Sequence, residues 1–448
     1  MENLQKGSKK LLNAWAFYDW ANSVYTLTIA SSIFPIFYSA LFINQTEKIV
    51  PAFGFDFKST ALITFITAFT FLVVAFTSPI LSGIADYVGN KKNFLKFFCY
   101  VGGFGCIGLY FFSLENIYIS LLFYFMGLIG YWGSLVFYNS YLPDIAYPEQ
   151  QDSISAKGFS MGYIGSVTLL VINLVMVMYP NVFFIADEVL ENGQIVQSAS
   201  QVAMRYSFVM VGIWWIGFSQ YSFYWLPKGT STGQKVTKDV VLNGFKELKI
   251  VWRALKQNIV LKKYLQSFFV FSMAVQTIML VAVYFGEEEI NWGSDDAKTM
   301  GLIVSILIIQ LIAILGAILT SRASSKFGNI KTLIAINFIW MSLCFYAYFM
   351  ESPMQFYIAA ASVGFVMGGI QSLARSTYSK FLPETKDTTS YFSFFDVAEK
   401  IGIVIGMLIY GTIDQVTGSM RNSILFLFIF FLIGIFLLFR VLKQQKLE

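Results

Sequence analysis

Hydrophobic residues occur along this chain in long runs that are separated by short polar stretches. In runs such as "LIVSILIIQLIAILGAIL", polar and apolar residues do not alternate as they would in the strands of a membrane barrel. Most runs have roughly the 20 residues that a helix needs to cross a hydrocarbon core of about 30 Å. The pattern therefore predicts an all-α membrane protein that crosses the bilayer many times.

We count about twelve such spans, and an even number places both ends of the chain on one side of the membrane. The spans lie near residues 14–43, 59–84, 94–113, 117–141, 157–179, 205–226, 264–285, 299–321, 331–350, 354–378, 391–413 and 420–440.

Composition agrees with this class and excludes several chemistries. Of 448 residues, 56% are hydrophobic and only 13% are charged, which leaves too little polar material to cover a soluble fold. There is no histidine, so imidazole proton relays and HExxH metal sites are excluded. Cys99, Cys106 and Cys344 fall inside apolar runs and are expected to be buried, with no disulfide framework. We expect neither a metal nor a cofactor.

Basic residues gather on the side of the two termini, and acidic segments such as "ADEVLE" and "GEEEINWGSDD" lie in the opposite loops. Because Lys and Arg are enriched in cytoplasmic loops, both termini are predicted to be cytoplasmic, in a multi-pass protein of the inner membrane. The basic residues on the terminal side include Lys6, Lys9, Lys10, Lys91, Lys92, Lys96, Lys157, Arg322, Lys326, Lys331, Lys380, Lys386, Arg440, Lys443 and Lys446.

The two halves of the chain repeat each other. "VGNKKNFL" at 88–95 matches "FGNIKTLI" at 327–334, and "LPD" at 142–144 matches "LPE" at 382–384. The repeat predicts two six-helix bundles that are related by a pseudo-twofold axis along the membrane normal, with a cavity between them. The predicted units are an N-terminal bundle over 1–227, a linker over 228–262 and a C-terminal bundle over 263–448.

The linker contains a predicted amphipathic helix. Its apolar positions recur at helical spacing, and Lys246, Lys249, Arg253 and Lys256 occupy the other face. Such a helix is expected to lie on the anionic inner leaflet, with docking of a partner as the alternative. The apolar positions are Val241, Phe245, Leu248, Trp252 and Leu255.

The first span carries a polar stripe. Asp19, Asn22, Ser23 and Thr26 follow the i, i+3, i+4, i+7 spacing of one helix face. A carboxylate in mid-bilayer costs about 2.5–3.5 kcal/mol on insertion scales, so the stripe must face protein or water. It forms either a structural seam between helices or the lining of a cavity.

The tenth span supplies a counter-charge, because Gln371 and Arg375 lie one turn apart near its cytoplasmic end. Asp19 is at a similar depth in the first span. An Asp19–Arg375 pair could therefore close the inner mouth of a cavity, since each charge would offset the burial of the other.

Charged residues also occur in the eleventh span, "YFSFFDVAEKIGIVIG". Asp396 could pair with Lys400 one turn away or with Arg375, and Glu399 lies between them. We favour a structural role for Asp396, Glu399 and Lys400 over contact with a substrate. Pairs of glycines in two spans, Gly158 with Gly162 and Gly402 with Gly406, predict close contacts between helices.

Asp86 ends the second span in "SGIADYVGNKK", followed by Lys91 and Lys92. This combination can hold the end of a neighbouring helix by charge, or it is simply a basic cytoplasmic loop.

That stretch resembles the signature of the major facilitator superfamily between spans two and three. "WAFYDWANS", "GGIQSLARSTYSKFLP" and "YFSFFDVAEKIG" further resemble the vacuolar-effluxer family, which includes an autophagy-related fungal amino-acid exporter. The similarity covers essentially the whole chain. It implies twelve helices, alternating access by rocking halves and export of small solutes such as amino acids. By analogy, spans one, four, seven and ten line the cavity, and these carry Asp19, Asn22, Tyr25, Asn139, Gln276, Gln371 and Arg375.

The chain departs from the family pattern in three places. Ser82 stands where the loop signature usually has glycine, and Ser325 stands at the repeat position of Asp86. Ser272 and Met273 replace a more polar, acidic pair in span seven, which removes the acid expected there.

The leading function is a secondary transporter or uniporter, because no Walker sequence for ATP is present. A lipid or amphiphile translocase on the same scaffold is the alternative, while intramembrane hydrolase constellations and channel filter motifs are not found. If a proton or other cation is coupled, Asp19 is the first choice of carrier, and Asp396 or Glu399 the second. The expected partners are a small-molecule substrate and the lipid bilayer, without nucleic acid, and the protein is expected to be a monomer.

Overall fold

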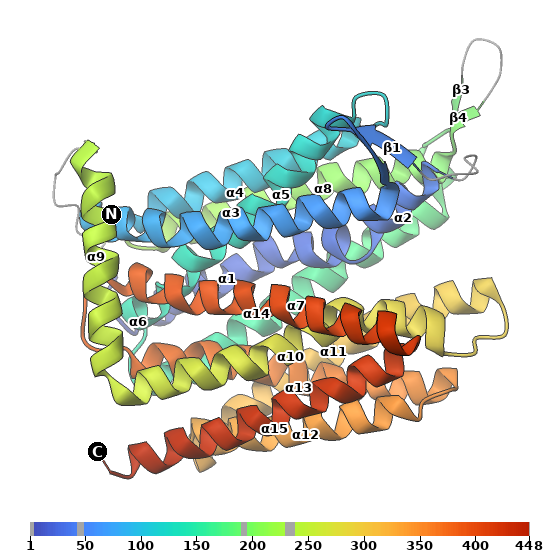
Figure 1. The fold of residues 1–448 in the computed structure, drawn as a ribbon. Helices are drawn as coiled ribbons and strands as arrows, with labels where there is room; N and C mark the ends of the chain where they lie inside the picture. The colour runs from blue at the N-terminus through green and yellow to red at the C-terminus, as the bar shows by residue number, and fades with distance from the viewer. Residues whose placement is uncertain (1–3, 43–48, 190–194, 229–237, 448) are drawn as a thin grey trace.

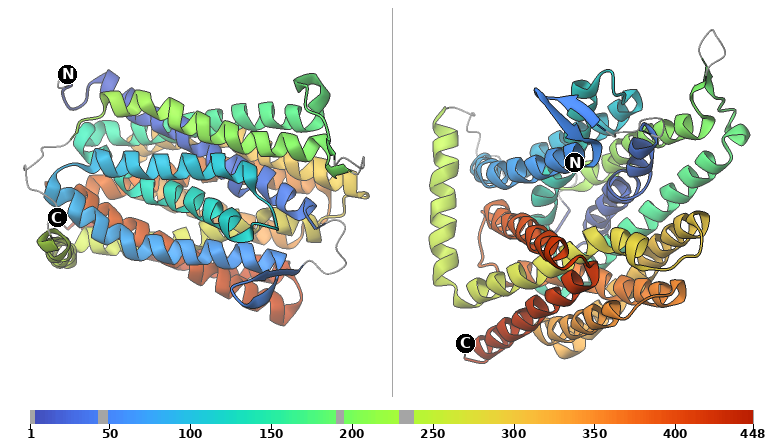
Figure 2. Two further views of the ribbon diagram at one scale, coloured as in Figure 1. Left: turned by 90° about the horizontal axis from the view of Figure 1, so that it is seen from above. Right: turned by 45° about the vertical axis from the view of Figure 1, so that its right-hand side comes forward.

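A computed structural model describes residues 4–42, 49–189, 195–228 and 238–447. Long helices run side by side, and both ends of the chain lie at the same end of the molecule (Figure 1). We call this end the terminal face and the other end the opposite face. Two further views show the same arrangement from above and after a turn of 45° about the vertical axis (Figure 2).

The first bundle is built from residues before 229, and two short antiparallel hairpins decorate its opposite face (Figure 1). Its helices are α1 Lys9–Val24, η1 Tyr25–Ala30, α2 Ile33–Ala40, α3 Ser59–Val88, α4 Lys91–Gly108, η2 Leu109–Phe111, α5 Ile117–Asn139, α6 Leu142–Ile145, α7 Pro148–Met178, η3 Pro180–Phe183 and α8 Ala199–Trp225. Its strands are β1 Ile49–Ala52, β2 Phe55–Lys58, β3 Glu188–Val189 and β4 Ile195–Gln197.

The second bundle follows the linker helix α9 (Lys238–Gln257). Each bundle has a buried hydrophobic cluster of its own, and α3 against α14 and α7 against α11 form the packed seams between them. The helices of the second bundle are α10 Ile259–Glu289, α11 Asp295–Phe327, α12 Asn329–Tyr348, α13 Pro353–Phe381, α14 Thr388–Thr417 and α15 Met420–Gln445.

The predicted fold class is confirmed. Within the described ranges, eleven helical segments are long and apolar enough to cross a membrane. The twelfth, α14, runs beside them but carries three charged residues within five positions, which makes it more polar. Several helices extend past the predicted spans at the terminal face, because polar residues there continue the helix beyond the apolar run. Thus α7 begins at Pro148, whereas the sequence predicted a start near residue 157.

The first membrane segment is not one regular helix. After Val24 the chain widens into the π-helical turn η1, and α2 begins only at Ile33. Widened turns of this kind are frequent at functional sites. Here the turn brings Thr26 and Leu27 to the wall of a central cavity.

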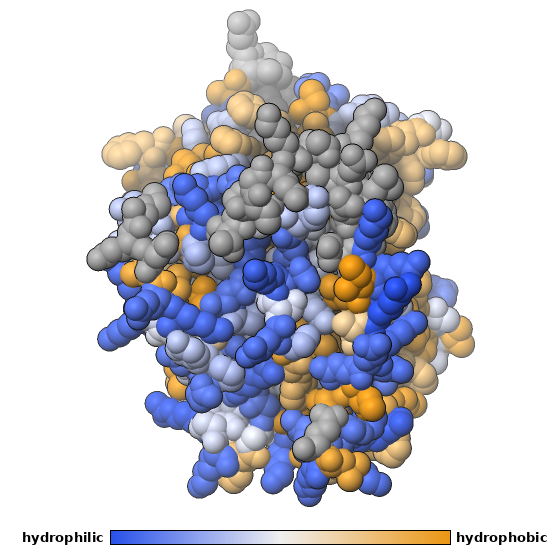
Figure 3. Space-filling model, turned by 90° about the vertical axis from the view of Figure 1, so that its left-hand side faces the viewer, coloured by the Kyte–Doolittle hydropathy of each residue, from blue (hydrophilic) through white to orange (hydrophobic). Residues whose placement is uncertain are grey.

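The linker helix α9 crosses the terminal face at a steep angle to the bundles (Figure 1). Its Val251 and Leu255 are buried in the core of the second bundle, and α9 also packs along α3. Leu255 therefore faces protein. The prediction that the apolar face of this helix lies on the leaflet is wrong at Leu255. The side chains of Val241, Phe245 and Leu248 lie outside the described part of the chain. Hydrophilic residues dominate the terminal face around the linker (Figure 3).

Candidate functional site

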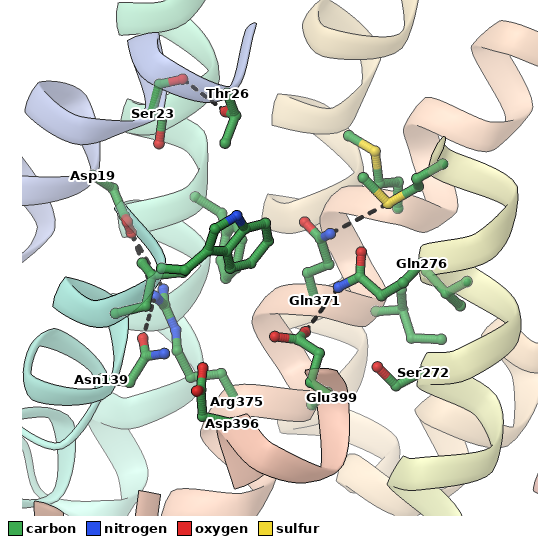
Figure 4. A pocket seen from close by; sticks show the side chains of 18 of the residues that line it. Asp19, Ser23, Thr26, Asn139, Ser272, Gln276, Gln371, Arg375, Asp396 and Glu399 are labelled. Atoms are coloured by element: carbon green, nitrogen blue, oxygen red, sulfur yellow. Dashed lines mark hydrogen bonds and ion pairs between the residues drawn. The ribbon is translucent and has the colours of Figure 1, made fainter. Parts of the chain in front are cut away.

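A cavity of about 230 Å³ lies between the bundles and is lined by residues of α1, α5 and α7 on one side and α10, α13 and α14 on the other (Figure 4). Its size suits a solute of several non-hydrogen atoms rather than a single water molecule. The polar lining consists of Asp19, Ser23, Thr26, Ser31, Asn139, Ser166, Ser272, Gln276, Gln310, Gln371, Arg375, Asp396 and Glu399. The aromatic lining consists of Tyr131, Trp132, Phe159, Tyr163, Phe268, Phe271 and Phe395.

Asp19 and Arg375 form a buried ion pair between the two bundles. The distance from Arg375 Nη2 to Asp19 Oδ2 is 3.4 Å, and the side chains are 4% and 8% exposed for arginine and aspartate. Asp19 lies ten positions after Lys9, and Arg375 lies six positions before Phe381, where their helices meet the terminal face. At 1.5 Å per residue, the two lie roughly 15 Å and 9 Å from that face. Both residues line the cavity, on the side nearest the termini.

The Arg375 guanidinium is fully hydrogen-bonded. Nε donates to Ser155 Oγ at 2.9 Å, Nη2 donates to the Ser155 carbonyl at 3.0 Å, and Nη1 donates to Asn139 Oδ1 at 3.1 Å. With the bonds to Asp19, these contacts engage all five N–H groups of the side chain. The rings of Trp15 and Phe159 stand 4.7 Å and 4.3 Å from the guanidinium carbon. Because most of these partners belong to the first bundle, Arg375 anchors the second bundle to the first.

Asp19 is held in place by Tyr138 as well. The Tyr138 hydroxyl donates to Asp19 Oδ2 at 2.8 Å, and its ring stacks on Trp15 with centroids 4.6 Å apart. All hydrogen bonds that Asp19 accepts from described side chains use Oδ2.

The charged residues of α14 form a second cluster, in which Asp396 and Glu399 line the cavity and Lys400 adjoins them. Lys400 Nζ lies 2.6 Å from Asp396 Oδ1 and 3.1 Å from Glu399 Oε2. Gln276 of α10 donates to Glu399 Oε1 at 2.8 Å, and Lys400 Nζ stands 4.2 Å from the ring centroid of Trp132. Asp396 thus pairs with Lys400 on its own helix, the first of the two pairings that the sequence allowed.

Gln371, predicted to line the cavity, spans the gap between the bundles. The hydroxyl of Tyr163 on α7 donates to Gln371 Oε1 at 3.2 Å, and Gln371 Nε2 lies 3.3 Å from the sulfur of Met279.

Asn22 and Tyr25 do not line the cavity, although the sequence placed them on a lining helix. Both are fully buried in the first bundle, where Tyr25 stacks on Tyr131 with centroids 5.2 Å apart. The helical period explains this: relative to Asp19, Ser23 is rotated by about +40° and Asn22 by about −60°. The cavity face of α1 is centred near Ser23, so the Asn22 side chain points into the core of the first bundle.

Asp86 caps a helix of the other bundle at the terminal face. Its Oδ2 accepts hydrogen bonds from the amide and hydroxyl of Ser390, both at 2.7 Å, and Oδ1 accepts from the Thr389 amide at 3.3 Å. A carboxylate at the start of α14 satisfies free N–H groups and faces the positive end of the helix dipole.

The two lysines after Asp86 differ in their contacts. Lys91 pairs with Asp144 and donates to Thr388 Oγ1 at 3.0 Å, so it also reaches the second bundle. Lys92 donates to the Leu226 carbonyl at 2.7 Å, within the first bundle.

A second acidic contact, which sequence reasoning missed, joins the bundles at Asp152 of α7. The Asp152 carboxylate accepts from Lys380 Nζ at 2.6 Å, Asn329 Nδ2 at 2.9 Å and Ser324 Oγ at 3.1 Å. Asn329 lies in the repeat "FGNIKTLI", at the position that corresponds to Asn90. In the second half, Ser324 and Asn329 on either side of the turn and Lys380 of α13 supply the donors, and the facing helix of the first bundle supplies the acid, which is the reverse of the Asp86 contact. Only the repeated turn signalled this site.

Hydrogen bonds between the bundles gather, within the described ranges, at the terminal face and around Arg375. These contacts hold the two bundles together at the terminal face. Across the same ranges, no three His, Cys, Asp or Glu side chains come together as a metal-binding group.

The family described as vacuole effluxer Atg22 like matches residues 7–448 of this chain. The chain belongs to this family. It is 30% identical over 450 residues to the uncharacterized MFS-type transporter YxiO of Bacillus subtilis (strain 168), covering 99% of this chain and 98% of the relative. It is 24% identical to autophagy-related protein 22 of Eremothecium gossypii, covering 96% of this chain and 90% of that protein.

Among solved structures, the fold is similar to that of the fucose:proton symporter FucP of E. coli. The TM-score is 0.67 at 14% sequence identity, covering 96% of this chain and 98% of that one. With the family match, this makes the vacuole-effluxer-like chain a multi-pass transporter of the major facilitator type and not an enzyme.

Proposed function

We propose that this transporter moves a small zwitterionic solute of the amino-acid class across the cytoplasmic membrane by alternating access. The observation that carries the proposal is the Asp19–Arg375 pair, which joins the two bundles at the terminal end of the cavity. The excess of Lys and Arg on the terminal side supports a cytoplasmic location for both termini, so the closed gate faces the cytoplasm.

Opening this gate separates two charges that are buried in the closed form. A buried charge that loses its partner is destabilised by about 3–5 kcal/mol, so an opening without compensation is rare. A zwitterion supplies the compensation, because its carboxylate can pair with Arg375 and its ammonium with Asp19. The occupant thereby favours the open form by its differential affinity for the two states.

The polar lining supports an occupant that is hydrogen-bonded at both ends. Asn139 lies beside Arg375, and Gln276 and Gln371 lie on the second-bundle side of the cavity. One charge moved across 100 mV supplies about 2.3 kcal/mol, which at about 1.4 kcal/mol per tenfold sustains a gradient of roughly fiftyfold. A single coupled proton is therefore sufficient, and because one chain carries both bundles, a monomer can work alone.

The test is flux in proteoliposomes with a panel of labelled amino acids, sugars and nucleosides, and with fluorescent lipids. We expect saturable flux of one or more amino acids, at least tenfold lower in Asp19→Asn and Arg375→Ala, and unchanged in the exposed Glu149→Gln variant of α7. Flux restricted to sugars or nucleosides contradicts the proposal. Lipid movement without a water-soluble substrate supports the translocase alternative instead.

A further inference from the structure

The charged groups around the cavity do not balance. The described residues at its wall include three carboxylates, Asp19, Asp396 and Glu399, and two cations, Arg375 and the adjoining Lys400. The Asp19–Arg375 pair is neutral and the guanidinium is saturated with acceptors. The excess negative charge therefore resides in the α14 triad, where Lys400 serves two carboxylates.

Asp396 carries the part of the triad that lacks a partner. Lys400 occupies its Oδ1, and within the described structure Oδ2 is buried without a hydrogen bond. The residue is only 5% exposed, yet it lines the cavity. A carboxylate oxygen in this position is costly when ionised, because neither water nor a donor compensates its charge.

We propose that the triad of Asp396, Glu399 and Lys400 is the proton-loading site of this transporter, and that one proton binds its carboxylate pair. This inference rests on the proposed function as a transporter and assigns the coupling ion to α14 rather than to Asp19. Proton binding forms one O–H bond on a carboxylate and makes the triad neutral. Release of the same proton to water on the other side restores the negative charge.

Among the described residues packed around the triad, no second cation pairs with its carboxylates. The Ser78 hydroxyl of α3 lies beside Asp396, and Gln276 of α10 donates to Glu399. From α5, Trp132 covers Lys400, and Tyr131 lies on the cavity wall within electrostatic range of Glu399, Asp19 and Arg375. Trp252 of α9 packs on Phe394 of α14, and the neighbouring cations Arg253 and Lys256 are exposed. From α15, Arg421 is bound to Glu289 of α10.

Neutralisation connects the site to alternating access. A triad with net charge disfavours a conformation in which the cavity holds no water. The protonated triad is neutral and is compatible with that conformation. Loading and release of the proton therefore accompany passage between the closed and open forms. The Asp19–Arg375 gate stays available for the solute.

Infrared difference spectra of the full-length protein in lipid bilayers, recorded during acidification, test this directly. We expect a carboxylic-acid C=O band to appear at higher pH than that of exposed carboxylates, which protonate at about pH 4. The band is lost in both Asp396→Asn and Glu399→Gln, because either change leaves Lys400 with a single carboxylate. In Lys400→Gln it appears at still higher pH. Asp414→Asn, on the same helix outside the triad, leaves it unchanged.

A band that survives in both Asp396→Asn and Glu399→Gln, or that disappears in Asp19→Asn, overturns the assignment. Thermal unfolding of each variant, monitored by circular dichroism, identifies any variant that is not folded. The shift of the band to higher pH in Lys400→Gln then provides an independent test. The spectra need no transported solute. A missing amino-acid flux together with the expected band pattern would contradict the proposed substrate and leave the proton site standing.

Discussion

Gly158 of α7 lies directly against the carboxylate of Asp19. A Cβ atom added to Gly158 would come 2.5 Å from Asp19 Oδ2 and 3.1 Å from Arg375 Nη2. One turn further along, Gly162 gives the same close approach to Ser23. The two glycines therefore let α1 and its carboxylate reach the ion pair, as the spacing of small residues predicted.

Replacing Gly158 with alanine should displace the ion pair. We expect Gly158→Ala to lower the free energy of unfolding by about 1–3 kcal/mol, because the site is overpacked. The matched control is Gly217→Ala in α8, where a Cβ meets open space. This control should be neutral or stabilising by up to about 1 kcal/mol, since alanine favours helix. Thermal unfolding in detergent compares them, and equal shifts for the two variants would contradict the close approach.

The effects of Asp19→Asn and Arg375→Ala on stability and transport should not be additive. Each change leaves the other charge buried without its main partner, at a cost of about 3–5 kcal/mol. The double variant should be no less stable, and no slower in transport, than the more damaging single variant. Fully additive losses in a double-mutant cycle would show that the two side chains act independently.

Loss of the Asp152 contact should loosen the terminal face. In Asp152→Asn, Lys380 loses a buried ion-pair partner that lies 2.6 Å away. We expect Ala374→Cys, placed in the buried cavity wall, to react several-fold faster with a membrane-impermeant maleimide added from the terminal side. Glu149→Gln, an exposed change in the same helix, serves as the control and should leave the rate unaltered. An unchanged rate in Asp152→Asn would remove this contact from the closure.

The contacts of Asp86 and Asp152 should act independently, because they share no partner residue and lie on different seams, α3–α14 and α7–α11. We therefore expect the increases in labelling rate for Asp86→Asn and Asp152→Asn to multiply in the double variant. A double variant that labels no faster than the quicker single variant would indicate that breaking either contact is already enough to open the terminal face.

Much of the fold follows from the sequence. Apolar runs of membrane length located the spans, and the repeat around "VGNKKNFL" and "FGNIKTLI" predicted the paired bundles. The contact between Asp19 and Arg375 was predictable because two opposite charges at matching depth in apolar spans need partners. Their role as a gate stays a prediction, as do the boundaries of the two halves and the linker.

Features that depend on helix rotation or on polar helix ends escaped prediction. Asn22 shares a nominal stripe with Asp19, but a rotation of about 60° is enough to take it out of the cavity. Asp152 and Ser155 precede the apolar run of their span, so hydropathy placed them in a loop although α7 already begins at Pro148. The side-chain partners of Arg375 and Lys400 depend on packing between distant helices, which no single-helix pattern contains.

The central claim is that the bundles separate at the Asp19–Arg375 level during each transport cycle. Ser155 Oγ donates to the Ser372 carbonyl at 2.7 Å across this boundary, which makes the two positions a suitable cross-linking pair. The most direct measurement is amino-acid flux through the Ser155→Cys, Ser372→Cys protein in proteoliposomes, before and after oxidation. The account predicts that the disulfide stops flux and that a reductant restores it; undiminished flux through the cross-linked protein would contradict it.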